Sequence, residues 1–201
     1  MMKLFYSKTS PYSRKAVLTI LELGLEKSVE LVVTNPTADE HLRNSNPLSK
    51  VPTLLTDDGD TLYDSPVICE YLNAQAKGKI FPKSGLTRWE TLKRQALADG
   101  LMDAAVRCYL EFKRPENEQH RDVIARQFLA IDAALKAFEN DPPSNRKRTP
   151  LIGELALAAA LGYMDLRLGQ QRNWRKDHPK LRKWFKAFSE RPSMQATQPP
   201  V

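Results

Sequence analysis

Short runs of β-prone residues alternate with helical patterns over the first 76 residues of the chain. Two of these runs, residues 3–7 and 29–33, are rich in aliphatic and aromatic side chains and predict two strands. Two more, residues 52–56 and 61–63, flank the sequence Asp57-Asp58-Gly59-Asp60, which is typical of a hairpin turn. The first half of the chain is therefore expected to hold four short strands.

Three helices are predicted between and after these strands. Apolar residues recur at helical spacing over residues 11–23, where Pro11 suits the first turn and Gly24 suits the C-terminal cap. A short helix is expected over residues 38–45, and a third begins with Ser65 as its N-cap. The order βαβαββα predicts a mixed four-stranded sheet, because a parallel crossover is followed by a hairpin.

Helical spacing alone marks the second half of the chain. A polar segment that contains Gly and Pro, residues 77–86, predicts a linker between the two halves. We therefore expect an α/β domain over residues 1–76 and an all-α domain over residues 87–201.

The helices predicted in the second half each carry an apolar stripe that is expected to be core. Thr149 is expected to cap the Ala-rich helix that covers residues 155–168. Residues 181–188 are expected to form the final helix, and residues 146–148 are expected to form a loop. The stripes begin at Trp89, Ile124, Leu155 and Leu181.

Charge differs between the two halves. The formal net charge is +7; residues 1–76 hold 7 basic and 10 acidic residues, and residues 77–201 hold 24 and 14. The basic residues at 175–186 surround the apolar positions of the last predicted helix, so a solvated helix face is favoured over a nucleic-acid surface. No helix-turn-helix, zinc-finger or RNA-binding pattern supports nucleic-acid binding.

Other features exclude several classes of protein. No run of about 18 apolar residues occurs, so no membrane span is expected. The N-terminal apolar stretch is too short for a secretory signal, which makes the cytoplasm the expected location. Cys69 and Cys108 form neither a disulfide framework nor a zinc site, and no metal is expected.

The sequence Ser10-Pro11-Tyr12-Ser13 lies between the first predicted strand and the first helix. With Cys at both Ser positions it would be the redox motif of glutaredoxins, so this chain lacks a thiol couple there. A helix N-terminus still stabilises a thiolate that a ligand supplies, and a Ser hydroxyl can donate a hydrogen bond to it. A thiol pKa near 8.5, lowered by about two units, leaves the sulfur mostly ionised at neutral pH. Equally, Ser10 could simply cap the helix.

Two further segments fit the same kind of ligand. Residues 46–54 lead into the third strand, and a cis Val51-Pro52 bond would turn the Val51 backbone outward to pair with an extended peptide. At Asp64-Ser65, backbone N–H groups and a hydroxyl would form an anion site for a carboxylate. Each segment alone is more common in structural roles than in binding.

The order and spacing of these segments resemble the glutathione transferase family, particularly bacterial members whose first loop reads Thr-Ser-Pro. The similarity spans nearly the whole chain and is strongest in KLFYSKTSPYSRK, NPLSKVPTLLTDDGDTLYDSPVICEYL and HPKLRKWFKAFSERPSMQATQPP. It implies a thioredoxin-like first domain that binds reduced glutathione, a helical second domain that holds an electrophile, and a homodimer. The glutathione ligands it implies are Ser10 at the sulfur, Val51 and Pro52 at the cysteinyl backbone, Lys50 at the glycyl carboxylate, Asp64 and Ser65 at the γ-glutamyl end, and Asp103 across the dimer interface.

Some positions depart from the family pattern. Ser7, Thr9 and Ser13 compete with Ser10 for the sulfur, and Tyr6 and Tyr12 are weaker rivals; Ser10 leads because it occupies the first Cys position. At the start of the Ala-rich helix the family shows a hydroxyl residue three positions before Asp, whereas this chain has Leu151 and Glu154. The electrophile pocket is expected to include Tyr12, Met102, Val106 and Tyr109.

Two classes of function follow from this resemblance. In the first, the protein is an enzyme that ionises glutathione and transfers it to a small hydrophobic electrophile. In the second, it is a non-catalytic adaptor that binds a protein partner, for which the basic second half is the motivation. Thiol-disulfide reduction is disfavoured because Ser10 and Ser13 replace both sulfurs.

Overall fold

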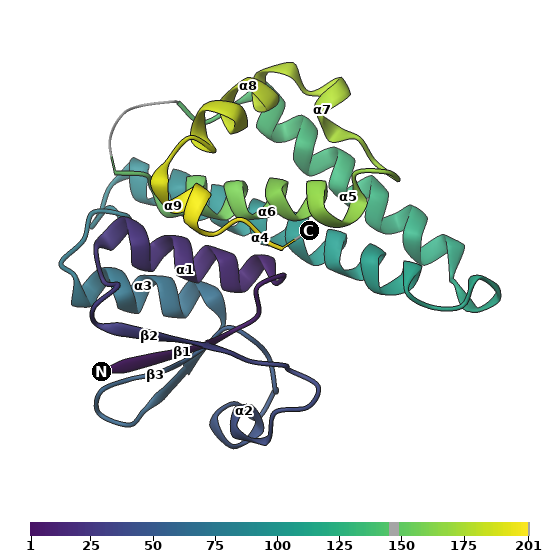
Figure 1. Cartoon of the computed structure of the whole chain (residues 1–201). Coiled ribbons are helices and arrows are strands. Elements are labelled where there is room, and N and C mark those ends of the chain that lie inside the picture. Colours follow the sequence, from purple (N-terminus) through teal and green to yellow (C-terminus); the bar gives the residue numbers. More distant parts are fainter. Residues whose placement is uncertain (145–148, 201) are drawn as a thin grey trace.

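The computed structural model describes residues 1–144 and 149–200. A four-stranded sheet and its helices precede a bundle of helices, as the sequence pattern predicted. In Figure 1, α1 (Pro11–Leu23) and α3 (Ser65–Gln75) lie between the sheet and the helical bundle. The loop predicted at residues 146–148 lies outside the described residues.

The sheet has the strand order β2-β1-β3-β4. Strand β1 (Met2–Tyr6) pairs in parallel with β2 (Val29–Val33), and β3 (Thr53–Leu55) runs antiparallel to β1 and to β4 (Thr61–Tyr63). The crossover and the hairpin predicted from the sequence are thus both confirmed. The short helix α2 (Glu40–Ser45) precedes β3.

Capping residues set the ends of the two helices that pack on the sheet. Gly24 adopts φ +68° and ends α1, as expected, because its N–H reaches back to the Ile20 and Leu21 carbonyls. The cap expected for α3 is wrong by one residue. Asp64, not Ser65, is the N-cap, and its carboxylate accepts the Ser65 N–H at 2.7 Å.

The helical bundle is built on α4 (Leu86–Phe112), α5 (Arg121–Asn140) and α6 (Ile152–Leu168), with α4 packed against both others. Helix α6 is buried almost along its whole length, which explains its Ala and Leu composition. The chain then forms α7 (Trp174–Asp177), α8 (Pro179–Phe188) and α9 (Pro192–Ala196), and a 3₁₀ turn (Glu116–Glu118) precedes α5.

Three expectations for the second half need correction. Trp89 is 68% exposed, because the apolar stripe of α4 joins the core only further along the helix. Helix α6 is capped at Leu151, not Thr149, and the Glu154 carboxylate accepts the Leu151 N–H at 2.7 Å. The short α9 follows the helix that was expected to be last.

The apolar side of α8 is buried and its basic residues face outward, so this helix has an exposed basic face. None of the helices within the described ranges has the length and apolar content needed to span a bilayer.

Candidate functional site

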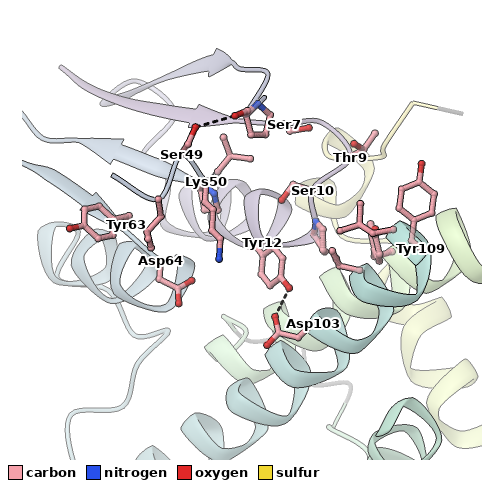
Figure 2. A pocket seen from close by; sticks show the side chains of 18 of the residues that line it. Ser7, Thr9, Ser10, Tyr12, Ser49, Lys50, Tyr63, Asp64, Asp103 and Tyr109 are labelled. Atoms are coloured by element: carbon pink, nitrogen blue, oxygen red, sulfur yellow. Dashed lines mark hydrogen bonds between the residues drawn. The ribbon is translucent and has the colours of Figure 1, made fainter. Parts of the chain in front are cut away.

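A cavity of about 740 Å³ lies at the N-terminal end of α1, between the sheet-containing half and the helical bundle. Loops before α1 and β3 form one wall, and α4 and α6 form the other. Figure 2 shows Lys50 and Asp64 facing Tyr12 and Asp103 across it. Nine residues expected at the site line it, namely Ser10, Tyr12, Lys50, Val51, Pro52, Asp64, Asp103, Val106 and Tyr109.

Two of the expected residues are not part of the lining. Met102 is fully buried in the core of the bundle, so its expected place in the electrophile pocket is corrected. Ser65 is 1% exposed, immediately behind Asp64, and its hydroxyl has no hydrogen-bond partner among the residues that the structure describes. A buried hydroxyl without a partner costs free energy, and a bound polar group can relieve that cost.

Ser10 caps α1 and also lines the cavity. Its Oγ accepts the Ser13 N–H at 3.2 Å and so caps α1. A hydroxyl has two lone pairs and one proton, so this cap leaves the Ser10 O–H able to donate to a ligand. Pro11 has no N–H, and in the described part of the chain the Tyr12 N–H has no acceptor, so the helix end adds a second donor.

The rival hydroxyls differ in their access to the cavity. Ser7 and Thr9 both line it. Ser13 is fully buried and its Oγ accepts the Ser7 N–H at 3.3 Å, so it holds the loop instead of facing a ligand. Tyr6 lines a different cavity, beside α9.

Tyr12 and Asp103 join the two walls of the cavity. The Tyr12 hydroxyl donates a short hydrogen bond to the Asp103 carboxylate, as Figure 2 shows. Burial, and then this hydrogen bond and the charge of Asp103, raise the pKa of Tyr12 above its usual range. Tyr12 therefore stays protonated, but its one O–H is already donated to Asp103 and is not available to a thiolate. Asp103 lies in the same cavity as Ser10, with a partner in its own chain.

The segment before β3 is held by one buried amide. Asn46 donates from Nδ2 to the Lys50 carbonyl at 3.1 Å and to Thr53 Oγ1 at 2.9 Å. The Val51-Pro52 bond is cis. Within the described ranges no hydrogen-bond partner takes the Val51 N–H or C=O, so both are available to an extended peptide.

Backbone geometry at Asp64 differs from that of most residues. Asp64 has φ +51°, a conformation that non-glycine residues adopt rarely and that is concentrated at functional sites. Its side chain lies at the start of α3 and lines the cavity, and Figure 2 shows the Lys50 amino group pointing into the space beside it. This end of the cavity therefore offers one cation and one carboxylate.

A buried ion pair that the sequence pattern did not predict lies next to the site. Lys15 on α1 is fully buried and contacts Asp99 on α4 at 2.6 Å. Burial raises the pKa of Asp99, while the Lys15 charge opposes the rise. Asp99, Asp103 and Arg107 follow one another at intervals of four residues, so they lie on one face of α4. This spacing was the signal in the sequence that charged groups of α4 face the same side of the helix.

The chain supplies no reactive thiol at the site. Cys69 and Cys108 are buried, and burial raises the pKa of each to about 11. Within the described residues no group of three His, Cys, Asp or Glu side chains could hold a metal ion. The chemistry available is thus a hydroxyl and a helix end that can stabilise an anion brought by a ligand.

Comparison with known proteins identifies the family. The family models for the glutathione S-transferase N-terminal and C-terminal domains match residues 9–75 and 115–187. An uncharacterised GST-like protein of Escherichia coli strain K12, YibF, is 34% identical over 203 residues and covers 99% of both chains.

Solved structures agree with this assignment. A glutathione transferase family member from Pseudomonas fluorescens Pf-5 with bound glutathione has a TM-score of 0.93 and 38% identity, with full coverage of both chains. A second structure from that organism, with bound S-(propanoic acid)-glutathione, has a TM-score of 0.88 and 36% identity, also with full coverage. The resemblance seen in the sequence is confirmed, and the chain belongs to the glutathione S-transferase family.

Proposed function

We propose that the protein is a glutathione transferase that binds reduced glutathione, ionises its thiol and conjugates it to a small electrophile. In this reaction the thiol proton passes to solvent and the thiolate attacks the electrophilic carbon. A C–S bond forms, and the leaving group departs with its electron pair or, in an addition, the electrons move onto the acceptor. The glutathione bound in the Pseudomonas relative supports the choice of ligand.

The observation that carries this proposal is the Ser10 O–H at the N-terminal end of α1, which donates to no acceptor among the described residues. Its lone pair is used by the helix cap, so its proton is available to the glutathione sulfur. Lowering a thiol pKa by about two units requires about 2.7 kcal/mol of preferential interaction with the thiolate, which a charge-assisted hydrogen bond and a helix dipole can supply. Ser10 is therefore the proposed catalytic residue.

The remaining contacts are proposed from the lining of the cavity. The cysteinyl backbone of glutathione would pair with Val51 beside Pro52, and the glycyl carboxylate would meet Lys50. The γ-glutamyl carboxylate would take the Val67 N–H, because the Ser65 N–H bonds to Asp64 and Pro66 has no N–H. The Ser65 hydroxyl, directly behind the lining and without a partner among the described residues, would add a second donor, with Asp64 and Asp103 near the ammonium. Tyr12, Val106 and Tyr109 remain for the electrophile.

Assembly and location are also proposals. The exposed Val67, Leu86 and Trp89 on α3 and α4 are apolar enough to favour a homodimer. Two unpaired cysteines and a reduced thiol as co-substrate fit the reducing cytoplasm.

The test is a calorimetric titration with glutathione, followed by conjugation assays with an aryl halide, an alkyl halide and an α,β-unsaturated carbonyl. Ser10→Ala should bind glutathione but lose the ultraviolet absorbance of the bound thiolate and most of the conjugation rate. Ser84→Ala, an exposed Ser outside the cavity, is the matched control. No binding at millimolar glutathione would eliminate the proposal. Binding without conjugation of any electrophile, together with a salt-sensitive protein partner, would instead support the adaptor.

A further inference from the structure

The charges that line the cavity are divided between its two ends. Asp64 and Asp103 lie near Tyr12 and the start of α3, whereas Arg107 and Arg167 line the part formed by α4 and α6. Arg107 follows Asp103 by one helical turn on α4, about 6 Å along the helix axis. The cavity therefore presents two carboxylates together with the Lys50 amino group to one part of a ligand, and two guanidinium groups to another.

Neither of these arginines pairs with a carboxylate in the part of the chain that the structure describes. Within residues 1–144 and 149–200, Arg107 and Arg167 form no ion pair, although Arg172, Arg175 and Arg191 each contact a carboxylate. The guanidinium carbon of Arg167 lies 4.6 Å from the centre of the Tyr109 ring. Stacking of this kind fixes the plane of the guanidinium group while leaving its N–H donors free.

Part of Arg167 is also buried without compensation. Its Nε has no hydrogen-bond partner among the residues that the structure describes, although it is shielded from solvent. The surrounding lining is apolar or aromatic and includes Val106, Tyr109, Leu110 and Tyr163. A shielded donor in such surroundings gains from an incoming acceptor, and the planar fork of Arg matches a carboxylate in particular.

We infer that the electrophile carries a carboxylate close to its reacting carbon, and that Arg167 and Arg107 bind this group. The inference rests on the proposed function, because it concerns the second substrate of that reaction. For a halogenated short-chain carboxylic acid, the glutathione thiolate attacks the carbon that bears the halogen. The C–S bond forms as the carbon–halogen bond breaks, and halide leaves with the electron pair.

The experiment compares two conjugates that differ only in charge. S-carboxyethyl glutathione and S-carbamoylethyl glutathione have nearly the same shape, and each is titrated calorimetrically into the wild type, Arg167→Met, Arg167→Lys, Arg107→Met and the control Arg126→Met. Arg126 is an exposed arginine on α5 outside the cavity. Conjugation of glutathione with a bromopropionate and with its amide gives the corresponding rates.

The wild type and Arg126→Met should bind the carboxylate conjugate about tenfold more tightly than the amide, the ratio expected for one charge-assisted hydrogen bond of about 1.4 kcal/mol. Arg167→Met and Arg107→Met should lose most of this preference, and Arg167→Lys should keep part of it. Glutathione itself should bind all variants alike, and the bromopropionate should react faster than its amide only where the preference remains.

Three results would overturn the inference and leave the proposed function intact. The wild type could show no preference, the preference could survive both Arg→Met changes, or these changes could weaken glutathione as much as the conjugate. The last result would assign the arginines to the carboxylates of the tripeptide. Failure of the proposed function is distinct, because then neither glutathione nor either conjugate would bind, or no electrophile would react.

Discussion

Removing one member of the buried ion pair between Lys15 and Asp99 is expected to cost more stability than removing both. The Lys15 side chain is fully buried and that of Asp99 is 20% exposed, with their charged atoms 2.6 Å apart. Asp99→Asn leaves a buried ammonium without its counter-charge, and such changes cost about 3–5 kcal/mol. The double variant Lys15→Met/Asp99→Leu removes both charges, so its stability should stay within about 1 kcal/mol of the wild type.

Lys15→Met should have an intermediate and pH-dependent effect. The remaining Asp99 carboxylate can be hydrated or protonated, so we expect a loss of about 1–3 kcal/mol at neutral pH. Burial raises the pKa of Asp99, and without Lys15 it rises further. A carboxyl group whose pKa is raised by folding contributes stability that is present below its unfolded pKa of about 3.9 and is lost as pH rises through the folded pKa. The loss in this variant should therefore shrink at acidic pH.

The assay is urea unfolding followed by tryptophan fluorescence, since Trp174 and Trp184 are buried in the bundle. The control is Lys3→Met, which removes an exposed ion pair with Glu30 and should cost less than about 1 kcal/mol. A double variant as unstable as Asp99→Asn would refute the reasoning, because the cost would then not come from an uncompensated charge.

Three further predictions concern the site and the bundle. Tyr12→Phe removes the hydrogen bond to Asp103 and should lower the free energy of unfolding in urea by about 1 kcal/mol. Because folding raises the pKa of Tyr12, the stabilisation that Tyr12 provides is lost only above a pH of about 10. Above that pH the variant should therefore lose less stability than the wild type. Gly153→Ala places a Cβ 2.8 Å from a carbonyl oxygen of α4 and should lower stability by about 1–3 kcal/mol, whereas Gly100→Ala, with open space around it, should raise it by up to about 1 kcal/mol. Ser10→Cys should react quickly with a chromogenic disulfide at mildly acidic pH, because a thiol at a helix N-terminus has a pKa below about 8.5; the slow reaction of an ordinary thiol would contradict this.

Features fixed by neighbouring residues could be predicted from the sequence. The hairpin follows from a four-residue turn between two β-prone runs, and the end of α1 follows from a glycine in the left-handed conformation. The Ser10 cap is equally local, since donor and acceptor are three residues apart. At the start of α3, two adjacent capping residues were present, and only the geometry selects Asp64 over Ser65.

Features that depend on distant contacts could not be predicted in the same way. Helical periodicity identifies α4 but does not show which part of a 27-residue helix is covered, so Trp89 was wrongly expected in the core. Tyr12 was expected in the electrophile pocket and Asp103 at the γ-glutamyl end of glutathione. The hydrogen bond between them could not be predicted, because 91 residues separate them in the sequence. The unpaired Arg167 became evident only when α6 was placed beside Tyr109.

In the proposed function, the two serines at the start of α1 leave the sulfur to be supplied by a ligand. A Cys at position 13 would be buried and would accept the Ser7 N–H poorly, whereas the Ser13 hydroxyl holds the loop at 3.3 Å. At position 10 a hydroxyl can accept from the helix and donate outward at the same time, but it is too weakly acidic to act as the nucleophile itself. The helix end then has the capacity to stabilise an anion and no anion of its own. In the proposed function glutathione meets this need, because it supplies the sulfur along with an ammonium, two carboxylates and an extended backbone, and for each of these groups we propose a partner in this cavity.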